Sequence, residues 1–231
     1  FRNLTDVVGA APPPPPSGTG IPLTTSPYMQ DFSGLAAGLP QGFLVKIGAT
    51  ATSLGSGDMP LFGTGLGTST DWSNTSAGVK NFASATGLTS GATSAQQSAA
   101  VDRALGIRQT SATGYDFGSA YVFQLDNTTG KTNFQLSFLL QSLDATVGRT
   151  TPWIVDYGLG DTPATFTPVT TVPASLTSGP TFGSTPVTVN FGAALNNLNQ
   201  KVWIRVVTLA ATSGSGNRPS TGIDDVKFTW N

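Results

Sequence analysis

The feature that most constrains the fold is a series of short, strand-like segments separated by turn residues. In the clearest of them, residues 133–144, Phe134, Leu136 and Phe138 alternate with polar residues and share one face of an extended chain. Alternation with a period of two is typical of β-strands, and Gly, Pro and Asn are typical of the turns between them. Similar segments cover residues 43–47, 103–109, 119–126, 153–158, 187–191, 202–209 and 226–230. The sequence therefore predicts an all-β protein, an antiparallel β-sandwich of the jelly-roll kind.

The first thirty residues differ from the rest of the chain. A run of five prolines, Pro12 to Pro16, is expected to be stiff and extended, and it cannot join the interior of a sheet. We therefore expect an arm at residues 1–11, a Pro- and Gly-rich linker at 12–30 and the sandwich at 31–231. The apolar side chains of the arm are those of Phe1, Leu4, Val7 and Val8. An arm of this kind is suited to adding a strand to the sheet edge of a neighbouring copy, by donor-strand exchange.

Residues 50–100 are rich in Thr, Ser and Gly and carry few large apolar side chains. We expect this stretch to form loops and short edge strands over the sandwich. Its predicted anchors are Trp72, Val79 and Phe82.

The composition excludes several kinds of chemistry. The chain has no His, no Cys and no Glu, so all twelve acidic residues are Asp. Imidazole bases, thiolate nucleophiles and metal sites with nitrogen or sulfur ligands are therefore ruled out. A net charge of −1 gives no reason to expect nucleic-acid binding. No apolar run approaches the roughly 18 residues that a membrane-spanning helix needs.

Several stretches together resemble a module of extracellular multidomain proteins from Bacteroidota and related bacteria. They are DFSGLAAGLPQGFLV, VDRALGIRQT, YVFQLDNTTGKTNFQLSFLLQSLD and SGSGNRPSTGIDDVKFTW, in that order, and they cover residues 31–231. The resemblance implies a secreted, jelly-roll-like sandwich without catalytic activity of its own. The family is poorly characterised, so it indicates location and fold better than function. The chain begins at Phe1 without an initiator Met, which is expected of a processed, exported protein.

Three carboxylates are candidate ligands of a structural calcium ion. Asp31 lies near the start of the first predicted strand, and Asp224 and Asp225 lie at the start of the last one. Because the terminal strands of a jelly roll are often neighbours, these side chains are expected to approach one another. The alternative is that they cap turns or pair with Arg103 or Arg218. No other cofactor is expected.

Aromatic residues are candidate contacts for a sugar. Trp153, Trp203 and Trp230 lie within predicted strands and are expected in the core, which leaves Trp72 and Tyr115 as the candidates for an exposed surface. An Asp-only glycosidase would need two carboxylates facing each other, and Asp144, Asp156 and Asp161 are the only carboxylates near an aromatic strand. Their spacing does not require such a pair.

Two functions follow as competing expectations. The first is a non-catalytic extracellular structural subunit that assembles with copies of itself through its arm into a filament or surface layer. The motivating features are the apolar arm on its proline spacer, the low charge and a chain that stops at Asn231 with no following domain. The alternative is a carbohydrate-binding or adhesive module of a surface protein. Both place the protein outside the cell or at its surface.

Overall fold

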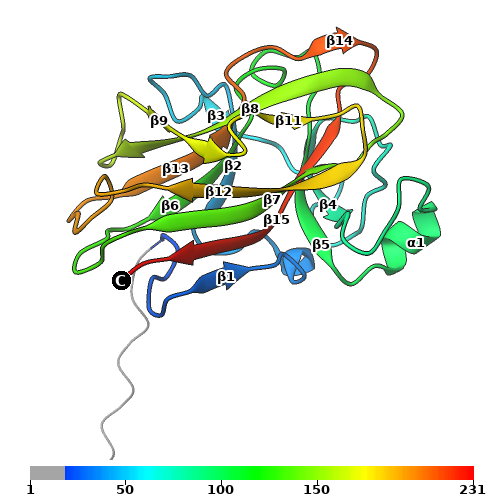
Figure 1. Ribbon diagram of the computed structural model, residues 1–231. Coiled ribbons are helices and arrows are strands. Elements are labelled where there is room, and N and C mark those ends of the chain that lie inside the picture. The colour runs from blue at the N-terminus through cyan, green and yellow to red at the C-terminus, as the bar shows by residue number, and fades with distance from the viewer. Residues whose placement is uncertain (1–18) are drawn as a thin grey trace, which may run out of the picture.

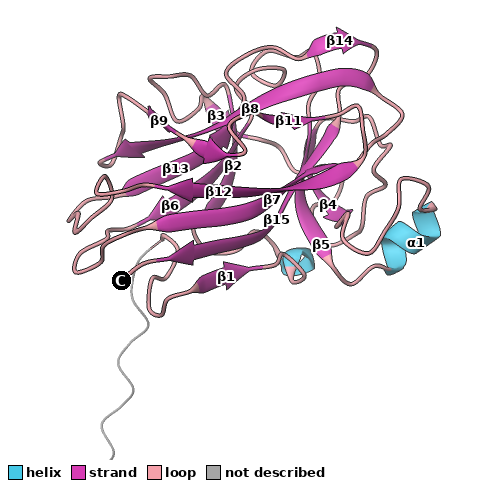
Figure 2. Cartoon of the chain, in the orientation of Figure 1, coloured by secondary structure: helices cyan, strands magenta, loops and turns pink. Residues whose placement is uncertain are grey.

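The computed structural model describes residues 19–231, which form an antiparallel β-sandwich (Figure 1). Strands make up almost all of its regular structure, and helix is confined to two short segments, η1 (Leu35–Ala37) and α1 (Ser94–Ala99) (Figure 2). The strands are β1 Tyr28–Gln30, β2 Phe43–Ile47, β3 Gly57–Asp58, β4 Gly78–Ala83, β5 Arg103–Arg108, β6 Ala120–Leu125, β7 Gln135–Ser142, β8 Gly148–Leu159, β9 Thr167–Val169, β10 Thr171–Val172, β11 Leu176–Ser178, β12 Gly183–Asn190, β13 Val202–Val207, β14 Ser213–Ser215 and β15 Ser220–Thr229. The all-β sandwich predicted from the sequence is confirmed.

Two sheets form the two layers. In the seven-stranded sheet the order is β10-β12-β7-β15-β5-β4, and β1 also pairs with β15. In the eight-stranded sheet the order is β11-β8-β13-β6-β2-β3, and β9 and β14 also pair with β8. The first and last strands of the described chain, β1 and β15, lie side by side (Figure 1). The first strand predicted from the sequence, residues 43–47, is β2 and lies in the other sheet, so it is not the neighbour of β15.

The main core lies between the two sheets and follows the alternation of the strands. On β7 the side chains of Leu136, Phe138 and Leu140 are buried, whereas Gln135 and Ser137 point to the other face. Phe123 of β6 and Phe228 of β15 meet edge to face across the layers at 5.9 Å between ring centroids. Burial of such aromatic and branched side chains is the main stabilising contribution to a sandwich.

Two smaller apolar clusters cover the outer faces of the sheets. One contains Trp72, Phe82 and Leu143 and packs residues 72–100 over β4 and β7. The other contains Phe166 and Trp203 on the outer side of β13. Strands β4, β5 and β13 are consequently buried on both faces. Trp72, Val79 and Phe82 are all buried, so the prediction that they anchor residues 50–100 is confirmed.

The folded domain begins earlier in the sequence than Asp31. Ile21 is 3% exposed and belongs to the main core, and β1 pairs with β15 through Tyr28, Met29 and Gln30. The part of the predicted linker from residue 19 to residue 30 is thus part of the sandwich. Strand β1 is only three residues long, too short for an alternation of apolar and polar residues that would distinguish it from a linker. It is held in place by pairing with β15. The predicted arm, residues 1–11, lies outside the described residues.

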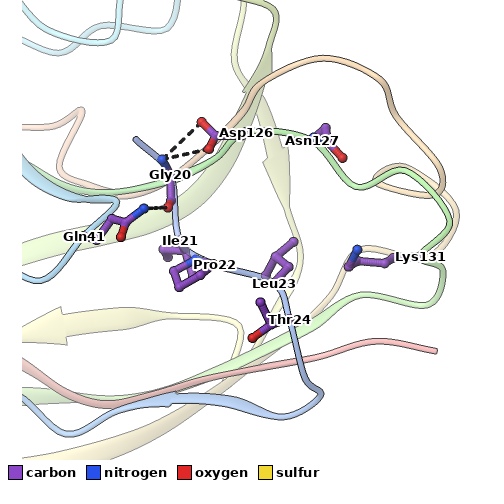
Figure 3. A pocket seen from close by; sticks show the side chains of 9 residues that line it. All are labelled: Gly20, Ile21, Pro22, Leu23, Thr24, Gln41, Asp126, Asn127 and Lys131. Carbon is purple, nitrogen blue, oxygen red and sulfur yellow. Dashed lines mark hydrogen bonds between the residues drawn. The ribbon is translucent and has the colours of Figure 1, made fainter. Parts of the chain in front are cut away.

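Asp126 anchors this first segment to the end of β6 (Figure 3). Both of its carboxylate oxygens accept a hydrogen bond from the Gly20 N–H at 3.1 Å, and the Gln41 side chain donates to the Gly20 carbonyl at 2.9 Å. A small cavity of about 180 Å³ lies beside these contacts, with Lys131 and Asn127 at its border. The contacts that Asp126 makes there are to the protein itself, so we interpret its role as docking the segment.

Replacement of Asp126 by Ala is expected to lower the free energy of unfolding by about 2 kcal/mol, because a hydrogen bond to a charged group contributes roughly 1.5–3 kcal/mol. Urea unfolding measures the change. Asp161→Ala is the matched control, because that carboxylate is 84% exposed in its ion pair with Lys201 and should contribute less than about 1 kcal/mol. Equal losses in the two variants would contradict a docking role for Asp126.

Candidate functional site

Four Asp residues lie near the point at which β15 stops pairing with β5 and starts pairing with β1. Residues 220–223 of β15 pair with β5, and residues 226–228 pair with β1. Asp224 and Asp225 lie between these two pairings, at an irregularity in the ladder with β7. Asp31 directly follows β1 and Asp102 directly precedes β5. We call these four residues the acidic junction. The sequence predicts the approach of Asp31 to the Asp224-Asp225 pair but not the presence of Asp102.

Asp224 is the buried member of the acidic junction. Its side chain is 0% exposed, and its Oδ1 accepts a hydrogen bond from the Asp225 N–H at 2.7 Å. Its Oδ2 is buried and has no hydrogen-bond partner within residues 19–231. Burial raises the pKa of Asp224 to about 7, against the lowering effect of the nearby Ser84 hydroxyl and the Asp225 N–H. The charges of Asp102 and Asp225 raise the pKa slightly further. Neither Arg103 nor Arg218 forms an ion pair with it; Arg218 pairs with Asp116.

The other carboxylates open onto the surface. Asp31 and Asp225 line one small cavity of about 200 Å³ together with Met29, Gln30 and Val226. Asp225 has a left-handed backbone conformation with φ of 48°, which Asp tolerates better than most residues. Burial raises the pKa of Asp102, and the charges of Asp225 and Asp31 raise it further. A cation placed here would therefore relieve an accumulation of negative charge.

The arrangement partly fits a calcium ion. Calcium takes six to eight oxygen ligands, and backbone carbonyls commonly supply some of them. Within residues 19–231 no three acidic side chains are close enough to hold a metal as a group. Asp31 and Asp225 share a cavity that Asp224 does not line, so a calcium ion would have to draw the three carboxylates closer together than they lie here. The site would need backbone carbonyls to complete its coordination.

Trp72 is not available to a ligand. Its side chain is 3% exposed, its indole N–H donates to the Ala83 carbonyl at 2.9 Å, and its ring packs against Phe182 at 5.0 Å between centroids. The expectation that Trp72 offers an exposed surface is wrong, because an apolar side chain in a loop can fold back onto the sheet that the loop covers. Trp153 and Trp203 are buried, as predicted from their places in strands.

Tyr115 lies in the loop between β5 and β6, where it is half-buried against the main core. Two residues later Phe117 is 57% exposed. Phe117 borders a cavity of about 410 Å³ between residues 111–117 and the turn at Gly48–Thr50. We call this cavity the Phe117 groove. Tyr115 was the aromatic residue predicted to be exposed in this loop, whereas Phe117 is the more exposed of the two.

The loop that forms the Phe117 groove is held firmly in place. The Gly48 N–H donates to the Gly114 carbonyl at 3.0 Å, and the Ala49 N–H donates to the Gly118 carbonyl at 2.9 Å. At Gly114, φ is +83° and a Cβ atom would lie 2.9 Å from the Gly48 nitrogen, so only glycine fits. The buried Gln109 amide donates to the carbonyls of residues 115 and 116 at 2.7 and 2.8 Å. The groove is therefore preformed.

One member of an ion pair, Asp116, lines the Phe117 groove. Arg218 donates to Asp116 at 2.5 Å, and the Thr212 N–H donates to the other oxygen of Asp116 at 3.1 Å. Burial alone would raise the pKa of Asp116, but the hydrogen bonds from Arg218 and Thr212 lower it to about 2. Asp116 is thus ionised at neutral pH. The groove combines an aromatic face with the fixed carboxylate of Asp116 and the hydroxyls of Thr50, Ser111 and Thr113.

The carboxylates considered for glycoside hydrolysis have separate roles. Asp144 pairs with Arg108 after β7, and Asp156 pairs with Arg205 within β8 of the other sheet. Asp161 pairs with Lys201 at the surface. Each carboxylate is thus matched with its own cation. The side chains of Phe1, Leu4, Val7 and Val8, predicted for the assembly arm, lie outside the described residues.

Comparison with known proteins shows likeness in fold only. No protein-family profile matches the chain, and no curated protein matches it in sequence. A cleaved adhesin domain of Lys-gingipain from Porphyromonas gingivalis is similar in structure, with 14% identity, a TM-score of 0.45 and coverage of 90% of this chain and 99% of that one. The CBM22-1 xylan-binding domain of a Paenibacillus barcinonensis protein shares 10% identity, with a TM-score of 0.38 and coverage of 79% and 97%.

A Stig cyclase from Fischerella is also similar, with 13% identity, a TM-score of 0.43 and coverage of 82% of this chain and 85% of that one. Within residues 19–231, no helix combines the length and the apolar character needed to cross a bilayer.

Proposed function

We propose that the protein is a non-catalytic extracellular binding module that holds a glycan in the Phe117 groove. The observation that carries the proposal is an exposed aromatic ring beside a preformed cavity with hydroxyl groups and a carboxylate held in place by Arg218. This is the alternative function expected from the sequence, now centred on Phe117 in place of Trp72.

The chemistry of the groove suits a sugar ring. A pyranose presents an apolar face of C–H groups, which can pack on an aromatic ring, and a rim of hydroxyls that need donors and acceptors. Phe117 provides the ring, and Asp116, Ser111 and Thr113 provide polar groups around it. A weakly binding ligand gains most from a site that loses little conformational entropy on binding, and the loop contacts at Gly48 and Gln109 keep that cost small.

Replacement of Phe117 by Ala is expected to weaken glycan binding about tenfold, because the variant loses the apolar area that the ring buries against the sugar and a stacking contribution of roughly 0.5–1.5 kcal/mol. A glycan array followed by isothermal titration of the best binders measures the effect. Val101→Ala serves as the control, since Val101 is 85% exposed and lies just before β5, outside the groove. Unchanged glycan affinity in Phe117→Ala would show that the glycan binds elsewhere on the protein. The absence of any bound glycan would reject the function.

A structural calcium ion at the acidic junction forms the second part of the proposal. Asp31, Asp224 and Asp225 would supply side-chain oxygens, and the observation that favours the ion is the buried, unpaired Oδ2 of Asp224. The ion would neutralise the carboxylates and fasten β1 and β5 to β15 where the sheet changes its pairing. The junction lies apart from the Phe117 groove, so we assign the ion to stability and not to contact with the ligand.

Assembly through the arm stays a prediction. Phe1, Leu4, Val7 and Val8 lie outside the described residues, and the contacts within residues 19–231 give it no support. Location outside the cell or at its surface belongs to the present proposal, because a glycan-binding module meets its ligand there.

A further inference from the structure

We infer that the glycan is acidic, and that its carboxylate or sulfate group enters a small cavity beside the Phe117 groove. The inference rests on the proposed glycan-binding function and adds the charge of the ligand. The cavity has a volume of about 160 Å³ and shares Ser111 with the groove. We call it the guanidinium cavity because Arg108 and Arg218 line it.

Two nitrogens of the arginines that line the guanidinium cavity are buried and have no hydrogen-bond acceptor within residues 19–231. Arg108 is 1% exposed, and its Nη1 donates to Asp144 at 2.7 Å and to the Ser220 hydroxyl at 2.8 Å. Its Nη2 is buried and has no partner within residues 19–231, and the same holds for Nε of Arg218. A buried N–H without an acceptor costs free energy, so an oxygen ligand that reaches these groups is stabilised by more than its new hydrogen bonds alone.

The charge around the guanidinium cavity selects an anion. Arg108 and Arg218 are the only charged residues among the described side chains that line it, and the rest are hydroxyl or amide residues such as Thr75 and Asn217. The carboxylates that pair with the arginines face elsewhere: Asp116 lines the Phe117 groove, and Asp144 lines a cavity beside Trp72. A group with several acceptor oxygens and a negative charge fits such a lining, because a guanidinium binds carboxylate and sulfate oxygens through charge-assisted hydrogen bonds.

One ligand can use both cavities. Asp116 of the groove and Arg218 of the guanidinium cavity are joined by their 2.5 Å hydrogen bond, and Ser111 lies on both surfaces. A sugar that packs on Phe117 would therefore carry its acidic group toward Arg218. Uronic acids and sulfated sugars share this chemistry.

The first test is a glycan array that contains neutral, uronic-acid and sulfated glycans, probed with the full chain. Acidic glycans are expected to dominate among the glycans that bind. Comparison of the uronic-acid glycans with the sulfated glycans shows whether a carboxylate or a sulfate supplies the charge. Binding confined to neutral glycans, with loss in Phe117→Ala, would overturn the inference while leaving the proposed function in place. The absence of binding to any glycan would reject both.

The second test adds a negative charge to the lining. Asn217 is exposed, so Asn217→Asp should fold normally, and it should weaken binding of the acidic glycans about tenfold through repulsion. Asn127→Asp is the matched control, because Asn127 is also exposed but follows the other end of β6. The affinity of the wild-type protein should also fall as salt is added. Equal effects of the two substitutions, measured by isothermal titration, would overturn the inference.

Discussion

Asp224→Asn is expected to stabilise the calcium-free protein at pH 8 and to remove its response to calcium. In the folded protein the pKa of Asp224 is raised from 3.8 to about 7, so the folded state binds a proton that the unfolded state has already released. The contribution of this group to stability is therefore complete below pH 4, declines as the pH rises from about 4 to about 7, and is absent above that range. A shift of about three pKa units corresponds to about 4 kcal/mol.

An asparagine at this position is neutral at every pH, so it should avoid the cost of a buried charge. We expect the unfolding temperature of the wild-type protein in a chelator to fall between pH 5 and pH 8, and that of Asp224→Asn to stay higher at pH 8. For a chain of this size about 4 kcal/mol corresponds to roughly 10 °C. Differential scanning calorimetry across this pH range measures both proteins.

Calcium should reverse the order of the two unfolding temperatures at pH 8, so that the wild-type protein becomes more stable than Asp224→Asn. Bound Ca²⁺ stabilises the ionised carboxylate, so it should raise the unfolding temperature of the wild-type protein at pH 8, and less at pH 5, where protons compete. Asp224→Asn should show little change on addition of calcium. Asp161→Asn, at an exposed ion pair, should behave like the wild type in every condition. A wild-type protein whose stability is indifferent to both pH and calcium would contradict the roles assigned to the acidic junction.

Arg205→Met is expected to destabilise the protein by about 3–5 kcal/mol, because it leaves the buried Asp156 without its cation. Arg205 and Asp156 are 0% and 1% exposed, and they form two hydrogen bonds of 2.8 and 2.6 Å across neighbouring strands. The guanidinium also lies over the ring of Phe166, 3.4 Å from its centroid. Urea unfolding measures the loss.

A second effect on binding follows from the loop contacts of Arg205. Its remaining N–H groups donate to the carbonyls of Ser53 and Thr50 at 2.6 and 3.1 Å, and Thr50 lines the Phe117 groove. Loss of these bonds should loosen one wall of the groove and weaken glycan binding in protein that is still folded.

Two further variants separate the two effects of Arg205. The double variant Asp156→Leu with Arg205→Met removes both charges and should recover most of the stability but not the binding. Lys201→Met, at an exposed ion pair, should cost less than about 1 kcal/mol. A single variant as stable as the wild type would show that the pair is not needed to offset the burial of Asp156.

The acidic junction could be predicted in part because it follows from strand order. Asp31 follows the first strand and the Asp224-Asp225 pair lies within the last one, and neighbouring terminal strands are usual in a jelly roll. Asp102 was missed because its position depends on β5 beginning near the same point of β15, which is a matter of register and length. The burial of Asp224, which gives the junction its chemistry, depends on the packing of the whole sheet.

The binding groove was less predictable. Trp72 and Phe117 both lie in Gly- and Ser-rich loops, and nothing in their local sequence distinguishes the buried ring from the exposed one. Trp72 is covered because residues 72–100 fold over β4 and β7, whereas Phe117 lies at the far end of a loop fastened to Gly48. The helix α1 had a local signal that the sequence analysis overlooked, the capping pair of Thr93 and Gln96.

The sequence by itself determined the all-β class, most of the central strands and the exclusion of imidazole and thiol chemistry, because alternation and composition are local properties. It also predicted neighbouring terminal strands, but it placed the first strand at residues 43–47 and not at β1. Only the tertiary structure decided that residues 19–30 belong to the sandwich, which aromatic ring reaches the solvent and which carboxylate loses its partners. These properties depend on contacts between residues far apart in the chain, and such contacts exist only once the two sheets have packed.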